Sequence, residues 1–206
     1  CSRCGAKSDE TAISATGHTF STENEFCTVC GENIIAGLLA YTIENGKETR
    51  TELRRYLLAE QQYLCCYCCR QIEESKCHNE HICPRNSETK HNSMDYQNIV
   101  ASCDGLNTCG KKKDCDYDFK RFVSPLDENC ESHFRFKIDG KIEGVTERGK
   151  YTIELLNLNA YELVQARKRV YNECCRMSEQ LGKEYIQTEY IIPKDGKLYP
   201  FVDMIN

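Results

Sequence analysis

Cysteine spacing limits the folds open to this chain more strongly than any other pattern in it. The sequence has 206 residues and 16 cysteines, and the run CCYCC at 65–69 places four cysteines in five positions. Adjacent cysteines form a disulfide only with strain, because the bond requires a Cα separation and a dihedral angle that neighbours do not easily reach. Pairs of the type CxxC are instead typical of metal sites. The pattern therefore favours bound metal over a framework of disulfides.

The cellular location follows from two further features of the sequence. A cysteine-rich chain is often secreted, but this one shows no apolar signal segment at its start. It also has no apolar run of about 20 residues that could cross a bilayer. We therefore expect a cytoplasmic protein in a reducing compartment, without membrane association.

The first 31 residues contain two cysteine knuckles, CSRCG and CTVCG, separated by a polar segment. The glycine that follows each pair lets the backbone turn so that its N–H groups face the thiolates. This spacing resembles that of a zinc ribbon, with free thiols as the alternative. The ligands of this zinc ion would be Cys1, Cys4, Cys27 and Cys30. We predict a zinc ribbon and linker over residues 1–46, up to the turn signal ENGKE.

A second set of paired cysteines brackets the middle of the chain. Cys65 and Cys68 form a CxxC pair within CCYCC, and Cys103 and Cys109 form a looser pair downstream. Four thiolates in this order predict a second zinc site that joins the two ends of a polar hairpin. Four other cysteines are interpreted as buried thiols that behave as small apolar residues: Cys77, Cys83, Cys115 and Cys130. Cys174 and Cys175 are expected to pack in the middle of a helix.

Periodicity predicts both helices and strands. Leucines at helical spacing predict a helix over 48–64, and a second helix is expected over 108–122, with aromatic residues for packing. Alternating apolar residues before a DGK turn predict a hairpin over 134–142. From Tyr151 the chain is expected to be helical, with a short helix followed by a long one that stops at Gly182.

The net charge of −5 does not indicate a protein covered in nucleic acid. Basic residues nevertheless cluster in one region, at Lys111, Lys112, Lys113, Lys120 and Arg121. A local basic patch can hold phosphates even when the total charge is negative. A solvated helix face is the alternative interpretation of such a lysine run.

Several motifs together resemble one group of nucleases. They are LRRYLLAEQQYLCCYCCRQI, NEHICPRN, DYQNIVASC, NTCGKKK and TIELLNLNAYELVQARKR, and they extend over about residues 48–206. Their combination resembles the HNH nucleases of bacterial Septu and retron-associated antiphage systems (PtuB-like proteins). The N-terminal ribbon lies outside this pattern. The resemblance implies an α+β fold, with a ββα-metal core over 47–125 and a hairpin and helical region over 126–206.

The resemblance also implies roles for individual residues. Of the cysteines in CCYCC, only Cys65 and Cys68 match the family's metal-binding positions. His81 matches the general base that takes a proton from the attacking water. Glu80 matches a ligand of the catalytic ion, Mg²⁺ or Mn²⁺, which would neutralise the phosphate and the departing oxygen. Asn98 matches the residue that holds the histidine-bearing loop in place.

One position departs from the family. After the fourth cysteine the family has a histidine that completes the metal site, and here the matching residue is Lys111, which cannot be a ligand while protonated. Asn107 and Asp114 are nearby oxygen donors that could substitute. Alternatively, Lys111 could contact the substrate phosphate. His78 and His91 flank the hairpin and are interpreted as exposed or substrate-edge residues.

Two functions of different classes are open from the sequence. The first is a metal-dependent HNH endonuclease that acts on DNA or RNA within an antiphage defence system. The resemblance implies an ABC-type ATPase as its partner, and a retron reverse transcriptase with its RNA–DNA product as a further one. The second is a two-zinc module that binds nucleic acid or a partner without cutting. Glu80, His81 and Asn98 favour the enzyme, because a binding module has no need for an acid–histidine pair.

Overall fold

The structure is a computed structural model that describes residues 46–84, 95–113 and 117–205. The predicted zinc ribbon with Cys1, Cys4, Cys27 and Cys30 lies outside these residues, as do His91 and Asp114. In the described parts, helices accompany two small antiparallel sheets, so the predicted α+β class is confirmed. No helix of these parts has the length and apolar character needed to span a membrane.

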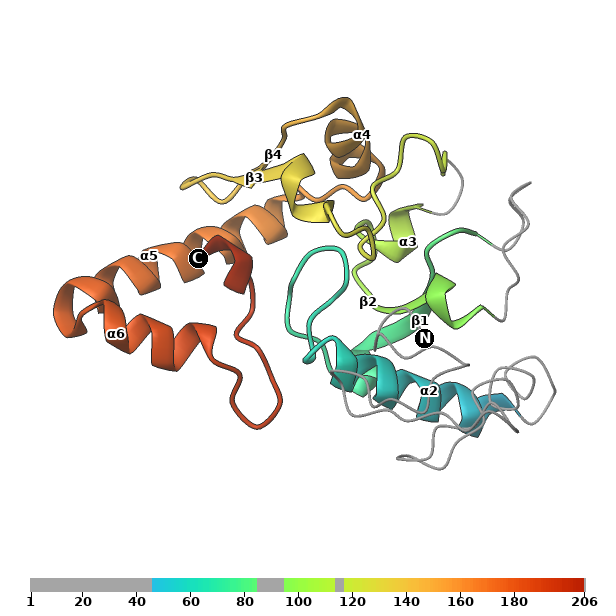
Figure 1. The fold of residues 1–206 in the computed structure, drawn as a ribbon, viewed down its shortest axis with the longest axis horizontal. Helices are drawn as coiled ribbons and strands as arrows, with labels where there is room; N and C mark the ends of the chain where they lie inside the picture. The colour runs from blue at the N-terminus through green and yellow to red at the C-terminus, as the bar shows by residue number, and fades with distance from the viewer. Residues whose placement is uncertain (1–45, 85–94, 114–116, 206) are drawn as a thin grey trace, which may run out of the picture.

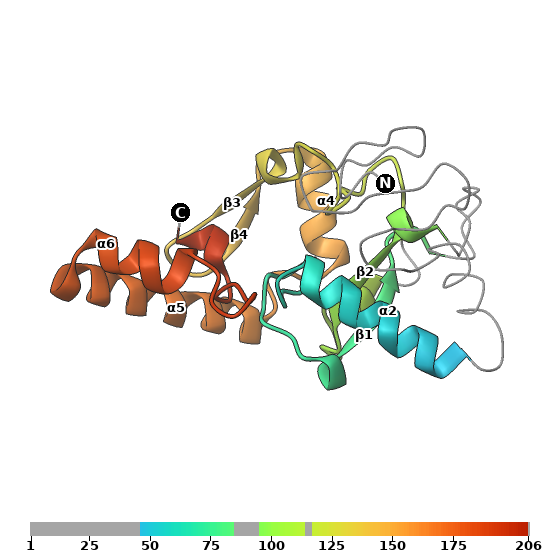
Figure 2. The same ribbon diagram turned by 60° about the horizontal axis from the view of Figure 1, so that its bottom comes forward.

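The helix α2 (Gly46–Glu60) packs against a two-stranded sheet of β1 (Cys77–His81) and β2 (Ile99–Cys103), as both views show (Figures 1 and 2). Its apolar stripe provides Leu57 and Leu58, which are almost fully buried. The predicted helix over 48–64 is correct up to Glu60. It ends there because Gln62 and Tyr63 take positive φ values of 49° and 61°, which a right-handed helix cannot contain.

The register of the β1–β2 hairpin decides which side chains can meet. Cys77 pairs with Cys103, and His81 pairs with Ile99 at the other end. Every residue of β2 is buried, so this strand forms the centre of the core. Because successive residues of a strand point to opposite faces, His78 and Glu80 share one face of β1 while His81 lies on the other.

The helix predicted over 108–122 is mostly wrong. Only α3 (Gly110–Lys113) is helical in the described part of that range, and residues 118–122 form a turn. The Oδ1 atom of Asp118 accepts a hydrogen bond from the backbone N–H of Lys120, at 2.9 Å. The backbone N–H of Asp118 in turn donates to the hydroxyl of Tyr151, also at 2.9 Å. Such side-chain bonds to the backbone offer the chain an alternative to a helix, which periodicity does not reveal.

The C-terminal region contains the predicted elements, although its short helix begins before Tyr151 and ends before the LNLN segment is complete. The predicted hairpin is formed by β3 (Phe134–Phe136) and β4 (Ile142–Gly144), and two helices follow, α4 (Glu147–Leu155) and α5 (Tyr161–Leu181). Gly182, with φ of 88°, ends α5 as expected. The short α6 (Lys183–Ile186) turns back along α5, and the pair forms an arm at one side of the molecule (Figure 1).

Short helical turns complete the described fold. They are η1 (Glu74–Lys76), η2 (Tyr96–Asn98), η3 (Cys130–His133), the π-helical η4 (Gln187–Ile191) and η5 (Val202–Met204). Two apolar clusters hold these elements together. The larger one joins α2, the β1–β2 hairpin and α4, and the smaller one lies between α5 and the segment after it, around Cys174, Ile186 and Tyr190.

Candidate metal centre and hairpin site

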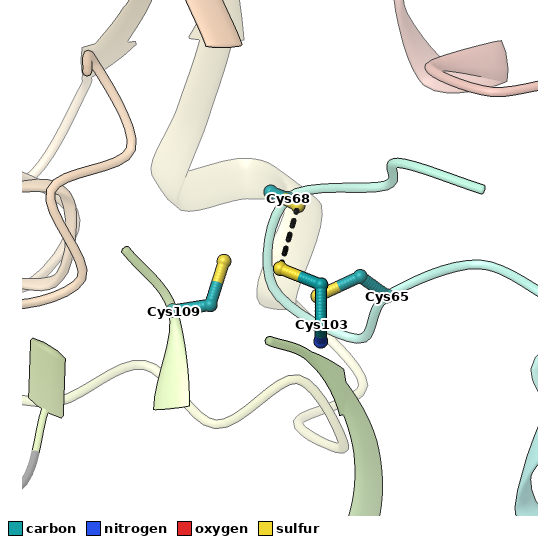
Figure 3. Close-up of side chains that lie close together, drawn as sticks. All are labelled: Cys65, Cys68, Cys103 and Cys109. Atoms are coloured by element: carbon teal, nitrogen blue, oxygen red, sulfur yellow. Dashed lines mark hydrogen bonds between the residues drawn. The ribbon is translucent and has the colours of Figure 1, made fainter. Parts of the chain in front are cut away.

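Four cysteines converge in the interior, from two loops that are far apart in the sequence (Figure 3). The sulfur atoms of Cys65, Cys68, Cys103 and Cys109 all lie within 4.8 Å of one another, and all four residues are buried. The Sγ atoms of Cys68 and Cys103 are 3.9 Å apart. Tetrahedral zinc with Zn–S bonds of about 2.3 Å places its thiolates about 3.8 Å apart, so this group could hold a zinc ion.

The backbone shapes this group through two turns. In the first knuckle the N–H of Cys69 donates to the carbonyl of Cys65 at 3.0 Å, and Cys69 takes a positive φ of 57°. The N–H of Cys103 donates to the Sγ atom of Cys65 at 3.3 Å, which is the kind of contact that stabilises a thiolate ligand. Cys109 also has a positive φ, of 56°. Cys66 and Cys69 stand outside the four-sulfur group, as the resemblance implied.

The segment LNLN connects this group to the C-terminal region. The carbonyl of Leu156 accepts a hydrogen bond from the N–H of Cys109 at 2.9 Å. The side chain of Asn157 donates to the carbonyl of Asn107 at 2.9 Å. The side chain of Asn159 makes two hydrogen bonds of 2.8 Å to the backbone of Ile142 in β4. Sequence reasoning used LNLN only as a mark of resemblance and missed this structural role.

Asn98 fixes the segment that follows His81. Its Oδ1 atom accepts from the N–H of Cys83 at 2.7 Å, and its Nδ2 atom donates to the carbonyl of Cys83 at 3.0 Å. The side chain is buried, so water competes little for these bonds. Its backbone carbonyl also accepts from the N–H of Ile82, at 2.8 Å. These contacts hold the chain immediately after β1, where His81 is half-buried.

Glu80 is at the centre of a buried cluster of charged groups. Its Oε1 atom lies 2.5 Å from the ammonium of Lys113, whose side chain is only 2% exposed. Its Oε2 atom lies 3.3 Å from the Nε2 atom of His78, and the Nδ1 atom of that imidazole is 2.8 Å from Asp104. Lys113 also donates to the carbonyls of His81 and Ile82. The lysine therefore connects Glu80 to the end of the strand that carries His81.

The opposite charges in this cluster stabilise the ionised forms of Glu80 and His78. Burial raises the pKa of Glu80, but the hydrogen bond from His78 and the charge of Lys113 outweigh it, so the pKa lies below its usual value. Burial lowers the pKa of His78, but Glu80 and Asp104 outweigh it, so the pKa lies above its usual value. Gly110 makes this packing possible, because a Cβ atom there would lie 2.6 Å from Oε2 of Glu80.

The structure shows the surroundings of His78 and Lys111. His78, predicted to be exposed or at the substrate edge, has a side chain only 23% exposed and bonded to two carboxylates. Lys111 is half exposed, and its ammonium is 3.9 Å from Asp104. The buried lysine is Lys113. Three consecutive lysines look equivalent in a sequence, and only the fold around the hairpin distinguishes them.

The chain is similar to a protein found in the comparison with curated proteins. The chain is 32% identical over 119 residues to a protein of Vibrio cholerae serotype O1 biovar El Tor named "Retron Vc95 putative HNH endonuclease". The aligned region covers 52% of this chain and 57% of the relative, so the chain spans little more than half of the length of the protein it matches. No profile of a known protein family matches the chain.

Proposed function

We propose that this chain is a metal-dependent HNH endonuclease that hydrolyses phosphodiester bonds of nucleic acid. One observation carries the proposal: Glu80 and His81 lie at one end of β1, in a β1–β2 hairpin that is fixed at both of its ends. The four-cysteine group fixes the Cys77–Cys103 end of the hairpin, and Asn98 fixes the chain beyond His81. The name of the Vibrio cholerae relative supports the same reaction class.

In the proposed reaction His81 is the general base. A neutral imidazole takes a proton from the water that attacks the phosphorus, and Asn98 keeps the strand end in position for this. Because Glu80 and His81 belong to opposite faces of β1, they can serve one phosphate only where the strand ends. Lys111, exposed on α3, would contact a phosphate oxygen of the substrate.

The residues around Glu80 fit a hard divalent ion. Oε1 of Glu80 is engaged by Lys113, while Oε2 lies beside Nε2 of His78 at 3.3 Å, a spacing suited to two ligands of one ion. We propose that Glu80 and His78 hold Mg²⁺ or Mn²⁺, with the ion displacing the proton from Nε2 of His78 while Nδ1 stays bonded to Asp104. His78 would then provide the imidazole that the sequence lacks at Lys111. When bound, such an ion stabilises the negative charge on the phosphate and on the leaving oxygen.

The four cysteines are proposed to bind a structural zinc ion. Thiolate ligands at tetrahedral spacing favour zinc over harder cations. A second zinc ion is proposed for Cys1, Cys4, Cys27 and Cys30. We also propose that the domain boundaries lie at residues 46 and 125.

The biological setting is part of the proposal. The net charge of −5 gives the protein no broad positive field to bring it onto nucleic acid unaided. The relative's name places that protein in a retron. We propose that the chain acts in the cytoplasm, in a Septu-like or retron-associated defence system. An ABC-type ATPase would control it, with a reverse transcriptase and its RNA–DNA product as further partners. Co-purification with such an ATPase, with and without residues 1–46, tests this.

A second function is favoured by one observation. Lys113 already neutralises Glu80 at 2.5 Å, as would suit a purely structural carboxylate. The alternative is a two-zinc module that binds nucleic acid or a partner without cutting it.

Cleavage assays decide between the two functions. The purified chain, alone and with the ATPase, would be incubated with duplex DNA, single-stranded DNA and RNA in Mg²⁺ or Mn²⁺. His81→Ala is expected to lower the cleavage rate by about 10²- to 10⁴-fold, the usual contribution of a general base. His133→Gln is the matched control, because His133 contacts Thr146 at the start of α4. Binding without metal-dependent cleavage under all conditions would favour the module.

A further inference from the structure

Arg167 is a buried cation without an acidic partner in the described structure. It lies on α5 and is completely shielded from solvent. Its Nη1 atom donates to the carbonyl of Gly140 at 3.2 Å, and its Nη2 atom donates to the carbonyl of Leu158 at 2.8 Å. Its Nε atom is buried and has no hydrogen-bond partner among the described residues. A buried charge without compensation is costly, so a negative charge should be close.

The fold brings this guanidinium close to the four-cysteine group by two routes. In the first, Leu158 follows Leu156 by two residues, and the carbonyl of Leu156 binds the N–H of Cys109. In the second, the guanidinium lies 5.7 Å from the centre of the Phe201 ring. The N–H of Phe201 donates to the carbonyl of Cys69 at 2.8 Å, directly after the first knuckle.

The hairpin of β3 and β4 completes the enclosure of Arg167. Gly140 has a φ of 88° at the turn of that hairpin, and a Cβ atom there would lie 2.3 Å from the carbonyl oxygen of Val164 in α5. Only glycine allows the turn to approach the helix this closely and present its carbonyl to Arg167. The hairpin runs alongside α5 in the ribbon (Figure 1).

Electrostatics point in the same direction as the geometry. Burial lowers the pKa of Arg167, while attraction to the thiolates of Cys68, Cys69 and Cys109 acts against it. Two of these three are members of the four-sulfur group. A zinc ion with four thiolate ligands leaves a net charge of two negative units in the interior. Zinc binding requires all four thiols to be deprotonated, and a nearby guanidinium favours that charge state.

We propose that Arg167 is the internal countercharge of a zinc–tetrathiolate centre formed by Cys65, Cys68, Cys103 and Cys109. Its positive charge stabilises the metal-loaded state more than the metal-free state. Because Arg167 also holds Gly140 and Leu158, zinc loading is coupled to the docking of α5 and the β3–β4 hairpin on the core. The inference rests on the zinc binding proposed above but not on nuclease activity.

Zinc affinity of the full chain tests this, in a Cys4→Ser background so that only the second centre is measured. Wild type, Arg167→Met, Arg167→Lys and Arg169→Met would be compared by competition with a chromophoric chelator at fixed pH. Arg169→Met is the matched control, because Arg169 is exposed on the same helix. Circular dichroism would report folding, and the Co²⁺-substituted spectrum would report the thiolate ligand set.

Arg167→Met is expected to weaken zinc binding by about 10- to 100-fold, the usual effect of losing a partner of a metal site. Arg167→Lys retains the positive charge and is expected to lose less zinc affinity than Arg167→Met. Arg169→Met is expected to bind zinc as tightly as the wild type. Equal losses in the Met and Lys variants, including failure of both to fold, would overturn the proposal. So would unchanged affinity in Arg167→Met. If the wild-type centre binds no zinc, the zinc proposal itself fails before Arg167 is at issue.

Discussion

The ammonium of Lys113 lies 2.5 Å from the carboxylate of Glu80, and both side chains are almost completely buried. The pair bridges α3 and β1, so it determines how α3, the helical turn directly after Cys109, sits on the hairpin. Breaking a buried pair on one side leaves an uncompensated charge, which is far more costly than losing an exposed pair. The stability of the hairpin should therefore depend strongly on Lys113.

We expect Lys113→Met to lower the free energy of unfolding by about 3–5 kcal/mol, since it leaves Glu80 buried without its closest cation. Lys112→Met is the control, because Lys112 is exposed one residue earlier, and a change within about 0.5 kcal/mol is expected. Urea denaturation of the zinc-loaded proteins measures both. Adding Glu80→Gln should recover part of the loss, because the remaining side chain is neutral. Equal stabilities of the two lysine variants would contradict the pair's role.

Helices and strands were predicted from the sequence better than the contacts between them. Leucine spacing defined α2, the alternating aromatics defined the β3–β4 hairpin, and Gly182 marked the end of α5, because each is a local signal. The four cysteines were also recognisable, since a CxxC pair followed by a looser pair of cysteines is typical of a metal site. The role of Lys113 was not, because its partners Glu80 and Tyr67 are separated from it by 33 and 46 residues and meet it only in the folded hairpin.

Local backbone conformations that compete with a helix explain why the helix predicted over 108–122 is mostly absent. The segment 108–122 has helical periodicity, but Cys109 requires a positive φ and Asp118 binds the backbone of Lys120. A continuous helix over 108–122 can contain neither feature, and neither is visible as a break in apolar spacing. The contact of His78 with Glu80 was missed for a related reason. The two residues share a face because side chains alternate along β1, and this followed only once residues 77–81 were known to form a strand.

Zinc content distinguishes the ligand cysteines from their neighbours in CCYCC. Cys65→Ser should remove one zinc ion and unfold the hairpin, because a structural zinc site contributes folding free energy directly. Cys66→Ala should keep the zinc, since Cys66 stands outside the four-sulfur group. Elemental analysis of the purified variants measures this, with two zinc ions expected in wild type if the N-terminal knuckles also bind one. Equal zinc content in both variants would show that the ligands are assigned wrongly.

Asn98 should matter for cleavage more than for zinc. Asn98→Ala removes both side-chain bonds to Cys83 and frees the strand end that carries His81, so we expect a large loss of cleavage rate. Asn98→Asp is a sharper variant, because its carboxylate still accepts from the N–H of Cys83 but cannot donate to the carbonyl. Zinc content should be unchanged in both. Wild-type cleavage by a folded Asn98→Ala protein would rule out a positioning role.

Two adjacent cysteines on α5 offer a test of how the C-terminal arm is packed. Cys174 packs as predicted, with Ile186 and Tyr190 between α5 and the segment after it, whereas Cys175 is exposed and its predicted packing role is wrong. Burial raises the pKa of Cys174 to about 11, so only a small fraction of it is thiolate near neutral pH. Because the thiolate is the nucleophile, iodoacetamide at pH 8 should modify Cys175 well before Cys174.

Fragment mass spectrometry of the peptide that contains both cysteines assigns the modified residue, and Cys175→Ser shows whether Cys174 reacts when its neighbour is absent.

Raising the pH towards 11 should increase the labelling of Cys174 in the folded protein, because its thiolate fraction rises as the pH approaches its pKa. Ile186→Ala should do the same at pH 8, since it opens the packing around the thiol. Equal labelling of the two cysteines in the folded wild type would mean that α6 does not pack against α5 in solution as the structure shows.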